Sequence, residues 1–185
     1  MDKKIENSNS IYKIAITGKM GSGKSTLAKI IGRQLNGHIT SFSTQIRKML
    51  SLTNLPIERN ILQKTGDFFR SFDKVVWVDM LLNEVKEVKQ SIIIDGIRYP
   101  FEAEKLKENG FVIIKIDSKD KLRRKRISER DQIQISDDMW TIWNAHPTET
   151  NLYEIEFNHI INNNESIENL ETSALSILNV ITKYK

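Results

Sequence analysis

The sequence contains no cysteine, which excludes disulfide bonds and metal sites built from thiolates. It has no apolar run that approaches the ~18 residues of a membrane-spanning helix. Residues 1–10 are polar, lack the apolar stretch of a signal peptide and are expected to form a frayed tail. These absences predict a cytoplasmic protein with no membrane partner.

Internal repeats and low-complexity linkers are absent as well. With 185 residues and 39% apolar side chains, the chain is long enough for one α/β domain with its own core, and we assign residues 1–185 to it. The net charge of +4 is modest and suits anionic substrates as well as nucleic acid. Composition therefore bounds the fold and leaves the function open.

Residues 18–25 fit the pattern G-x-x-x-x-G-K-[ST] and follow the apolar run at residues 14–16. A strand, a glycine-rich turn and a helix that starts near Ser25 would bring backbone N–H groups and the positive end of the helix dipole to one anion. We therefore predict a phosphate-binding loop. In it, Lys24 reaches the β- and γ-phosphates of a nucleoside triphosphate, and Ser25 offers its hydroxyl to Mg²⁺.

Apolar and β-branched runs alternate with helical patterns along the chain. Strands are expected at residues 13–17, 38–42, 91–95, 111–116 and 158–162. Helices are expected at residues 25–35, 43–52, 56–65, 75–89, 101–109 and 118–130 and around the apolar stripe 170–181, with Ser43 and Ser118 as N-caps, a break at 66–70 and a polar stretch at 131–148 to which no element is assigned. The alternation predicts a parallel sheet with helices on both faces and ligands outside the carboxyl ends of its strands.

Asp95 closes the third apolar run and should lie at the same edge of the sheet as the phosphate-binding loop. A carboxylate there can hold Mg²⁺ directly or through water, so Ser25 and Asp95 are the predicted metal ligands. The alternative is an aspartate that only shapes the turn before Gly96. The neighbouring phosphate-binding loop favours the metal site.

Three arginines, Arg47, Arg70 and Arg98, each follow a strand or a break in a helix. Phosphoryl transfer needs cations that hold two anions in line, and a guanidinium suits bidentate contact with phosphate. We predict that these arginines bind an anionic substrate. The alternative for each is a solvated surface side chain.

The densest charge run lies between Lys121 and Arg130. On a helix, Arg123, Arg126 and Arg130 fall on one narrow face. One interpretation is a lid that closes over a nucleotide and delivers arginines to the transferred group. A solvated helix face and a nucleic-acid patch are the alternatives, of which the patch is the less favoured because the run is short.

Taken together, these motifs resemble the nucleoside-monophosphate kinases among phosphate-loop proteins, and within them the phage-type deoxynucleoside monophosphate kinases. The similar segments are residues 16–25, 42–47, 62–77, 95–104, 126–131, 146–149 and 161–163. The phosphate-binding loop is generic, whereas the segments 66–77 and 95–104 are more distinctive.

The resemblance implies a P-loop NTPase three-layer fold with a five-stranded parallel sheet, an acceptor-binding segment at residues 43–75 and a lid at residues 121–147. ATP would lie on the loop residues Gly21, Ser22, Gly23, Lys24, Ser25 and Thr26, with Asn163 near the adenine. The acceptor phosphate would contact Arg47, Arg70 and Arg98, and Asp67 would contact the acceptor's sugar or base. Lys24, Asp95, Arg126 and Arg130 would carry the catalysis.

We therefore expect a Mg²⁺-dependent kinase that transfers a phosphoryl group from ATP to a (deoxy)nucleoside monophosphate and gives the diphosphate. The alternatives are a dephospho-coenzyme A kinase, a P-loop ATPase or switch without a small-molecule acceptor, and a protein that binds or phosphorylates nucleic acid. The expected partner is the monophosphate substrate. A homodimer is left open.

Overall fold

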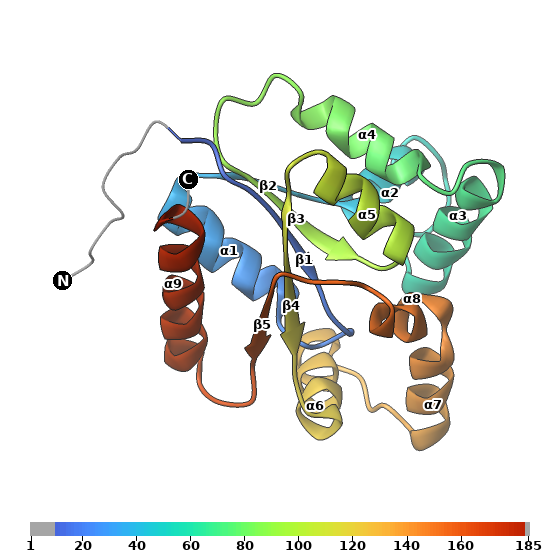
Figure 1. Cartoon of the computed structure of the whole chain (residues 1–185). Helices are drawn as coiled ribbons and strands as arrows, with labels where there is room; N and C mark the ends of the chain where they lie inside the picture. The colour runs from blue at the N-terminus through green and yellow to red at the C-terminus, as the bar shows by residue number, and fades with distance from the viewer. Residues whose placement is uncertain (1–9, 184–185) are drawn as a thin grey trace.

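The computed structural model describes residues 10–183, which contain a five-stranded parallel sheet in the order β2-β3-β1-β4-β5 (Figure 1). The strands are β1 (Lys13–Thr17), β2 (His38–Ser41), β3 (Ile92–Ile97), β4 (Val112–Asp117) and β5 (His159–Asn162). Every pairing in the sheet is parallel. The predicted fold class is confirmed. The tail predicted over residues 1–10 lies, apart from Ser10, outside the described residues.

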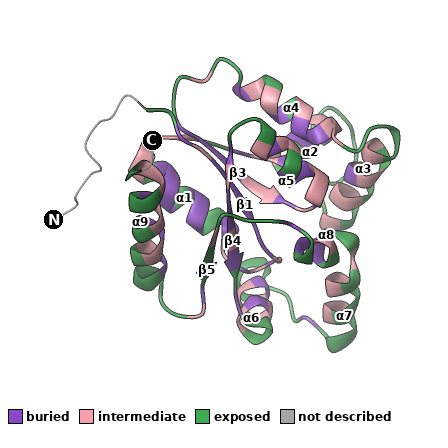
Figure 2. Cartoon of the chain, viewed as in Figure 1, coloured by how far each residue is buried: buried purple, intermediate pink, exposed green. Residues whose placement is uncertain are grey.

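Helices cover both faces of this sheet. They are α1 (Lys24–Leu35), α2 (Phe42–Leu50), α3 (Arg59–Phe72), α4 (Val76–Val85), α5 (Pro100–Glu108), α6 (Asp120–Asp131), α7 (Asp137–Ala145), α8 (Pro147–Thr150) and α9 (Ile167–Lys183), with a short 3₁₀ turn, η1 (Asn151–Tyr153). Helices α1 and α9 pack with one apolar cluster, and α2, α4 and α5 pack with another on the opposite face. The central strands are therefore buried on both sides (Figure 2). Among residues 10–183, no helix is both long and apolar enough to cross a membrane.

The predicted helix break at residues 66–70 is wrong, because α3 runs without interruption from Arg59 to Phe72. Tertiary packing explains why a glycine is tolerated inside this helix. The carbonyl of Gly66 accepts a hydrogen bond from the indole of the buried Trp77 at 3.0 Å. A Cβ at residue 66 would lie 3.2 Å from Ile46 Cδ1, so the glycine allows the close approach of α2. The predicted start at Pro56 is also wrong.

Two predicted N-caps and two element assignments are corrected. Helix α2 is capped by Ser41, whose hydroxyl accepts the amide of Thr44 at 3.1 Å, and not by Ser43. Ser118 does not cap α6; its hydroxyl donates to the carbonyl of Asn163 at 2.8 Å. Strand β3 continues through Asp95 to Ile97, and the polar stretch after α6 contains α7 and α8. Ser118 is drawn to a partner 45 residues away, whereas the cap of α2 is local.

Candidate active site

The phosphate-binding loop connects β1 to α1 and is enclosed by two other parts of the chain. Gly21 and Gly23 have φ angles of +73° and +103°, which side chains rarely adopt. A Cβ at residue 21 would lie 2.6 Å from the carbonyl oxygen of Arg123, and one at residue 23 would lie 2.4 Å from Nδ2 of Asn163. The glycines therefore let α6 and the turn after β5 press against the loop.

Asn163 and Arg126, both predicted to serve the nucleotide, meet behind the loop. The Asn163 amide donates to the carbonyl of Ser22 at 2.8 Å. The carbonyl of Asn163 accepts a hydrogen bond from Arg126 Nη2 at 3.1 Å, and Arg126 Nη1 donates to the hydroxyl of Ser118 at 3.1 Å. These contacts link the loop to the base of α6. The roles predicted for Asn163 with the adenine and for Arg126 in a lid stay predictions.

Lys24 is buried at the start of α1, with its ammonium group turned back onto the loop. Its Nζ donates to the carbonyls of Gly18 and Lys19, each at 2.9 Å. The pKa of Lys24 is lowered to about 7, mainly by burial and also by Arg98 and Arg59, while Asp95 and Glu149 oppose this shift. A bound polyphosphate would favour the charged form, because an opposite charge stabilises a buried ammonium.

Ser25 and Asp95 lie together, as the sequence predicted. The Ser25 hydroxyl donates to Asp95 Oδ2 at 2.6 Å. Asp95 Oδ1 is buried and has no hydrogen-bond partner within residues 10–183. A hydroxyl and a carboxylate at the end of a phosphate-binding loop are oxygen ligands that suit Mg²⁺, which takes few protein ligands and completes its shell with phosphate and water. The residues therefore fit the predicted metal, and the free carboxylate oxygen is the observation that supports it.

Arg98 reaches from the turn after β3 to the phosphate-binding loop. Its Nη1 donates to Glu149 Oε1 at 2.7 Å and lies 3.4 Å from the carbonyl oxygen of Gly18. Glu149 belongs to α8, has no exposed surface and also accepts the backbone amide of Met20 at 2.8 Å. The structure thus places Arg98 beside the loop and joins both to a buried carboxylate that the sequence analysis gave no role.

Arg59, at the start of α3, is a further cation near Glu149, and the sequence analysis gave it no role. Its guanidinium lies over the ring of Trp143 at 5.3 Å, and its Nη2 is 3.8 Å from Glu149 Oε1. Its Nε is buried without a hydrogen-bond partner among residues 10–183, and burial lowers its pKa. The signal available in the sequence was an arginine within the predicted acceptor segment, 43–75. The misplaced helix start hid its orientation.

The other two predicted acceptor arginines lie elsewhere. Arg70 is 11% exposed and pairs with the buried Glu102, at 2.9 Å from Nη2 to Oε1. Its guanidinium also covers the ring of Tyr99 at 4.6 Å. Arg47 is exposed on α2, and its side chain has no hydrogen bond or ion pair within the described chain. The structure therefore brings only Arg98 of the three to the phosphate-binding loop.

Asp67 lies on α3 among polar partners. Its carboxylate accepts the hydroxyl of Tyr99 at 3.3 Å, is 3.4 Å from Arg70 Nη1 and lies 3.6 Å from Nε2 of His146. The side chain keeps 42% of its surface exposed. Asp67 is therefore accessible to a ligand bound between α3 and the turn after β3, and its predicted contact with the acceptor stays a prediction.

The arginines of α6 do not form one face of a lid. Arg123 is fully buried, donates to the carbonyl of Met20 at 3.1 Å and lies over the ring of Trp140 at 5.0 Å. Arg126 turns to Asn163, whereas Arg130 is exposed and pairs with Asp131 at 2.6 Å. Arg123 is therefore part of the support beneath the loop. The catalytic role predicted for Arg130 stays a prediction.

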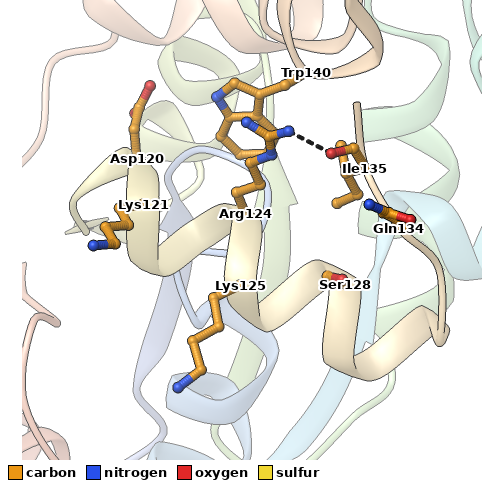
Figure 3. Close-up of a pocket in the computed structure, with 8 residues that line it drawn as sticks. All are labelled: Asp120, Lys121, Arg124, Lys125, Ser128, Gln134, Ile135 and Trp140. Atoms are coloured by element: carbon orange, nitrogen blue, oxygen red, sulfur yellow. Dashed lines mark hydrogen bonds between the residues drawn. The ribbon is translucent and has the colours of Figure 1, made fainter. Parts of the chain in front are cut away.

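The remaining cations of α6 face a separate cavity of about 460 Å³ (Figure 3). Its lining residues are Asp120, Lys121, Arg124, Lys125, Ser128, Gln134, Ile135 and Trp140. Figure 3 shows Arg124 turned inward, where it donates to the carbonyl of Ile135, while Lys121 and Lys125 project from the helix. A smaller pocket of about 250 Å³ adjoins the phosphate-binding loop at Gly18 and Lys19. No residue of the phosphate-binding loop, 18–25, lines the larger cavity.

Comparisons with known proteins agree with this geometry. A family model described as an AAA domain matches residues 14–145. The shikimate kinase from Acinetobacter baumannii, solved in complex with shikimate, is 16% identical with a TM-score of 0.64, and 96% of each chain is covered. A gluconokinase from Sinorhizobium meliloti 1021 is 14% identical with a TM-score of 0.62, and 94% of each chain is covered. The shikimate kinase from Bacteroides thetaiotaomicron is 18% identical with a TM-score of 0.61, over 94% of this chain and 99% of that one. No curated protein matches the sequence. At these identities, the likeness shows the fold.

Proposed function

The chain belongs to the AAA domain family, and we propose a function within it. The protein would transfer the γ-phosphoryl group of ATP to the phosphate of a nucleoside monophosphate, with a deoxynucleotide as the first candidate. The observation that carries the proposal is the convergence of Lys24, Arg98 and Arg59 beside the phosphate-binding loop. Three cations from three segments suit two phosphorylated substrates that must be held close together.

The carboxylates around Lys24 favour an acceptor that is already an anion. Transfer to a hydroxyl benefits from a general base that takes its proton. Glu149 is engaged by Met20 and Arg98, and Asp95 accepts from Ser25 with one oxygen and would hold Mg²⁺ with the other. In these roles neither carboxylate serves as a base, and a phosphate acceptor needs none. Arginines there would instead neutralise its charge.

Each group of site residues would have its own role in phosphoryl transfer. The loop amides and Lys24 hold the phosphates of the nucleotide, and Arg98 and Arg59 orient the acceptor. Ser25 and Asp95 would hold Mg²⁺, which neutralises charge on the phosphates when bound. The segment at residues 121–147 would exclude water, which suppresses hydrolysis.

A hydroxyl acceptor is the second candidate, and Asp67 is the observation that favours it. This carboxylate is accessible and lies beside Tyr99 and His146, where it could take a proton from a bound alcohol. The fold likeness to kinases of shikimate and gluconate belongs to this candidate, as does dephospho-coenzyme A as acceptor. A P-loop ATPase without an acceptor is the third.

The test is an ATP-to-ADP coupled assay with Mg²⁺ and a panel of acceptors. The panel contains deoxy- and ribonucleoside monophosphates, shikimate, gluconate and dephospho-coenzyme A, and Lys24→Met serves as the inactive control. Turnover that rises with one or more monophosphates supports the proposal. Turnover only with a hydroxyl acceptor overturns it, as does acceptor-independent hydrolysis that no compound stimulates.

Asp67→Asn separates the first two candidates. If Asp67 is a general base, kcat falls by about 10²-fold or more with little change in KM. If it contacts the sugar or base of a monophosphate, the main effect is on KM for the acceptor. The cytoplasmic location, the assignment of residues 1–185 to one domain and the homodimer stay predictions.

A further inference from the structure

A buried carboxylate in α8, just after the predicted lid at residues 121–147, connects this part of the chain to the phosphate-binding loop. Glu149 lies in α8, which directly follows α7 (Figure 1). Its Oε2 accepts the amide of Met20 at 2.8 Å, and its Oε1 lies 2.7 Å from Arg98 Nη1 and 3.8 Å from Arg59 Nη2. These two hydrogen-bond donors and one ion-pair partner come from the loop after β1, the turn after β3 and the start of α3.

We propose that Glu149 is a positioning residue of the transfer site, which fixes the phosphate-binding loop and two guanidinium groups before substrates bind. Its contacts stand on geometry alone. The identity of the anion that the guanidinium groups receive rests on the proposed function.

The contacts with Glu149 leave N–H groups of both guanidinium groups available to a ligand. Glu149 takes Nη1 of Arg98, so the edge formed by Nε and Nη2 of that side chain is not used by it; in Arg59 it takes Nη2, which also contacts Met20 Sδ at 3.1 Å, and leaves Nη1. Arg98 keeps 22% of its side-chain surface exposed, and Arg59 keeps 34%. A guanidinium has five N–H donors, and one edge can hold a carboxylate while the other meets a phosphate.

The charge of Glu149 also counters repulsion within the cluster. Lys24, Arg59 and Arg98 are like charges in a largely desolvated site, where they disfavour one another. A carboxylate with no exposed surface is itself unfavourable unless charged partners and N–H groups surround it. Glu149 therefore stabilises the arrangement only with these partners in place. This requirement couples the positions of the phosphate-binding loop, α3 and α8.

The first experiment observes the loop without any substrate. The variants are Glu149→Gln, which removes the charge and keeps the size, and Glu149→Asp, which keeps the charge and shortens the side chain. Glu154→Gln, an exposed glutamate on the same connection, is the matched control. In a ¹H–¹⁵N spectrum of the ligand-free protein, the Met20 amide proton should shift upfield and lose protection from hydrogen exchange in Glu149→Gln, and stay unchanged in the control.

The second experiment measures kinetics and nucleotide binding. In Glu149→Gln, KM for the monophosphate should rise about 10- to 100-fold with a smaller fall in kcat, because the arginines are no longer held. ATP affinity should fall as well, because the loop is no longer held through the amide of Met20. Glu149→Asp should recover part of both losses.

The outcomes separate this inference from the proposed function. A wild type that uses no monophosphate contradicts the proposed function, yet the Met20 amide and the affinity for ATP still test Glu149. If a folded Glu149→Gln keeps the wild-type Met20 amide and ATP affinity, the positioning role is wrong. If that variant does not fold, Glu149→Asp decides: a wild-type Met20 amide and acceptor KM in it overturn the role, and intermediate values support it.

Discussion

Two buried glutamates bracket the turn after β3, and they hold it in different ways. Glu102 accepts the backbone amides of Arg98 and Tyr99, at 2.9 and 3.2 Å, and pairs with the guanidinium of Arg70. Glu149 accepts the amide of Met20 and pairs with the guanidinium of Arg98. Arg98 is therefore fixed at its backbone by one carboxylate and at its side chain by the other.

The difference between the two sites lies in what surrounds the arginine. Arg70 is packed between Glu102 and Tyr99 with 11% of its side chain exposed, whereas Arg98 borders the phosphate-binding loop. Burial raises the pKa of Glu102, and Arg70 and the two amides oppose that rise. The same pair of residue types thus supports the fold in one place and holds a cation beside the phosphate-binding loop in the other. The following substitutions test this distinction.

Arg70→Ala should have the largest effect, and it should be on stability. It leaves Glu102 buried without its cation, which costs about 3–5 kcal/mol of the free energy of unfolding. Urea denaturation at 25 °C measures the loss. The double variant Arg70→Met with Glu102→Gln should recover much of the stability, because it removes both charges and keeps an acceptor for the amides of Arg98 and Tyr99. A fully stable Arg70→Ala with strongly reduced turnover would instead return Arg70 to the acceptor site.

Arg98→Ala should show the opposite division. We expect kcat/KM for the acceptor to fall by about 10²- to 10³-fold, because a charged donor at the transferred group is lost. The loss of stability should be smaller than in Arg70→Ala, since Glu149 keeps the Met20 amide and faces Arg59. Steady-state kinetics and urea denaturation on the same preparation give both numbers. Equal losses of stability in the two variants would erase the distinction.

Lys24, which lies near Glu149, should make the free energy of unfolding depend on pH. Its pKa is about 7 in the folded protein, against 10.5 for a lysine side chain in water, so the unfolded chain binds more protons between these values. This group therefore makes the ligand-free protein more stable as pH rises from about 7 to 10.5, by up to about 1.4 kcal/mol per pH unit.

The measurement is the difference in unfolding free energy between the wild type and Lys24→Met at several pH values. The difference should shift in favour of the wild type as pH rises through this window. A difference that stays constant with pH would mean that the ammonium of Lys24 is not desolvated in the folded protein. The Arg70→Ala variant should show the same Lys24 contribution as the wild type.

Arg47→Ala should have the smallest effect. Its side chain is exposed and makes no hydrogen bond or ion pair within residues 10–183. We expect a change in stability within about 0.5 kcal/mol and an acceptor KM within about twofold of the wild type. A tenfold rise in KM would show that Arg47 moves to the acceptor when it binds.

Features that depend on neighbouring residues could be predicted from the sequence. The glycines, Lys24 and Ser25 are covalently adjacent, so their spacing alone predicts a loop that holds an anion. The apolar runs of the strands follow from a sheet that is covered on both faces. Asp95 could be placed beside the loop because parallel strands end at one edge. The five strands and their layers were therefore predictable, whereas the helix through Gly66 depended on packing against Trp77.

Only the tertiary structure decided which arginines lie beside the phosphate-binding loop. Exposed and buried guanidinium groups look alike in a sequence, because their environment is set by carboxylates on other elements. Glu149 lies 129 residues from its partner Met20 and 51 from Arg98. Arg70 was removed from the loop by Glu102, and Arg59 was brought to it by the orientation of α3. The local sequence determined the phosphate-binding loop, and long-range ion pairs decided which cations lie beside that loop.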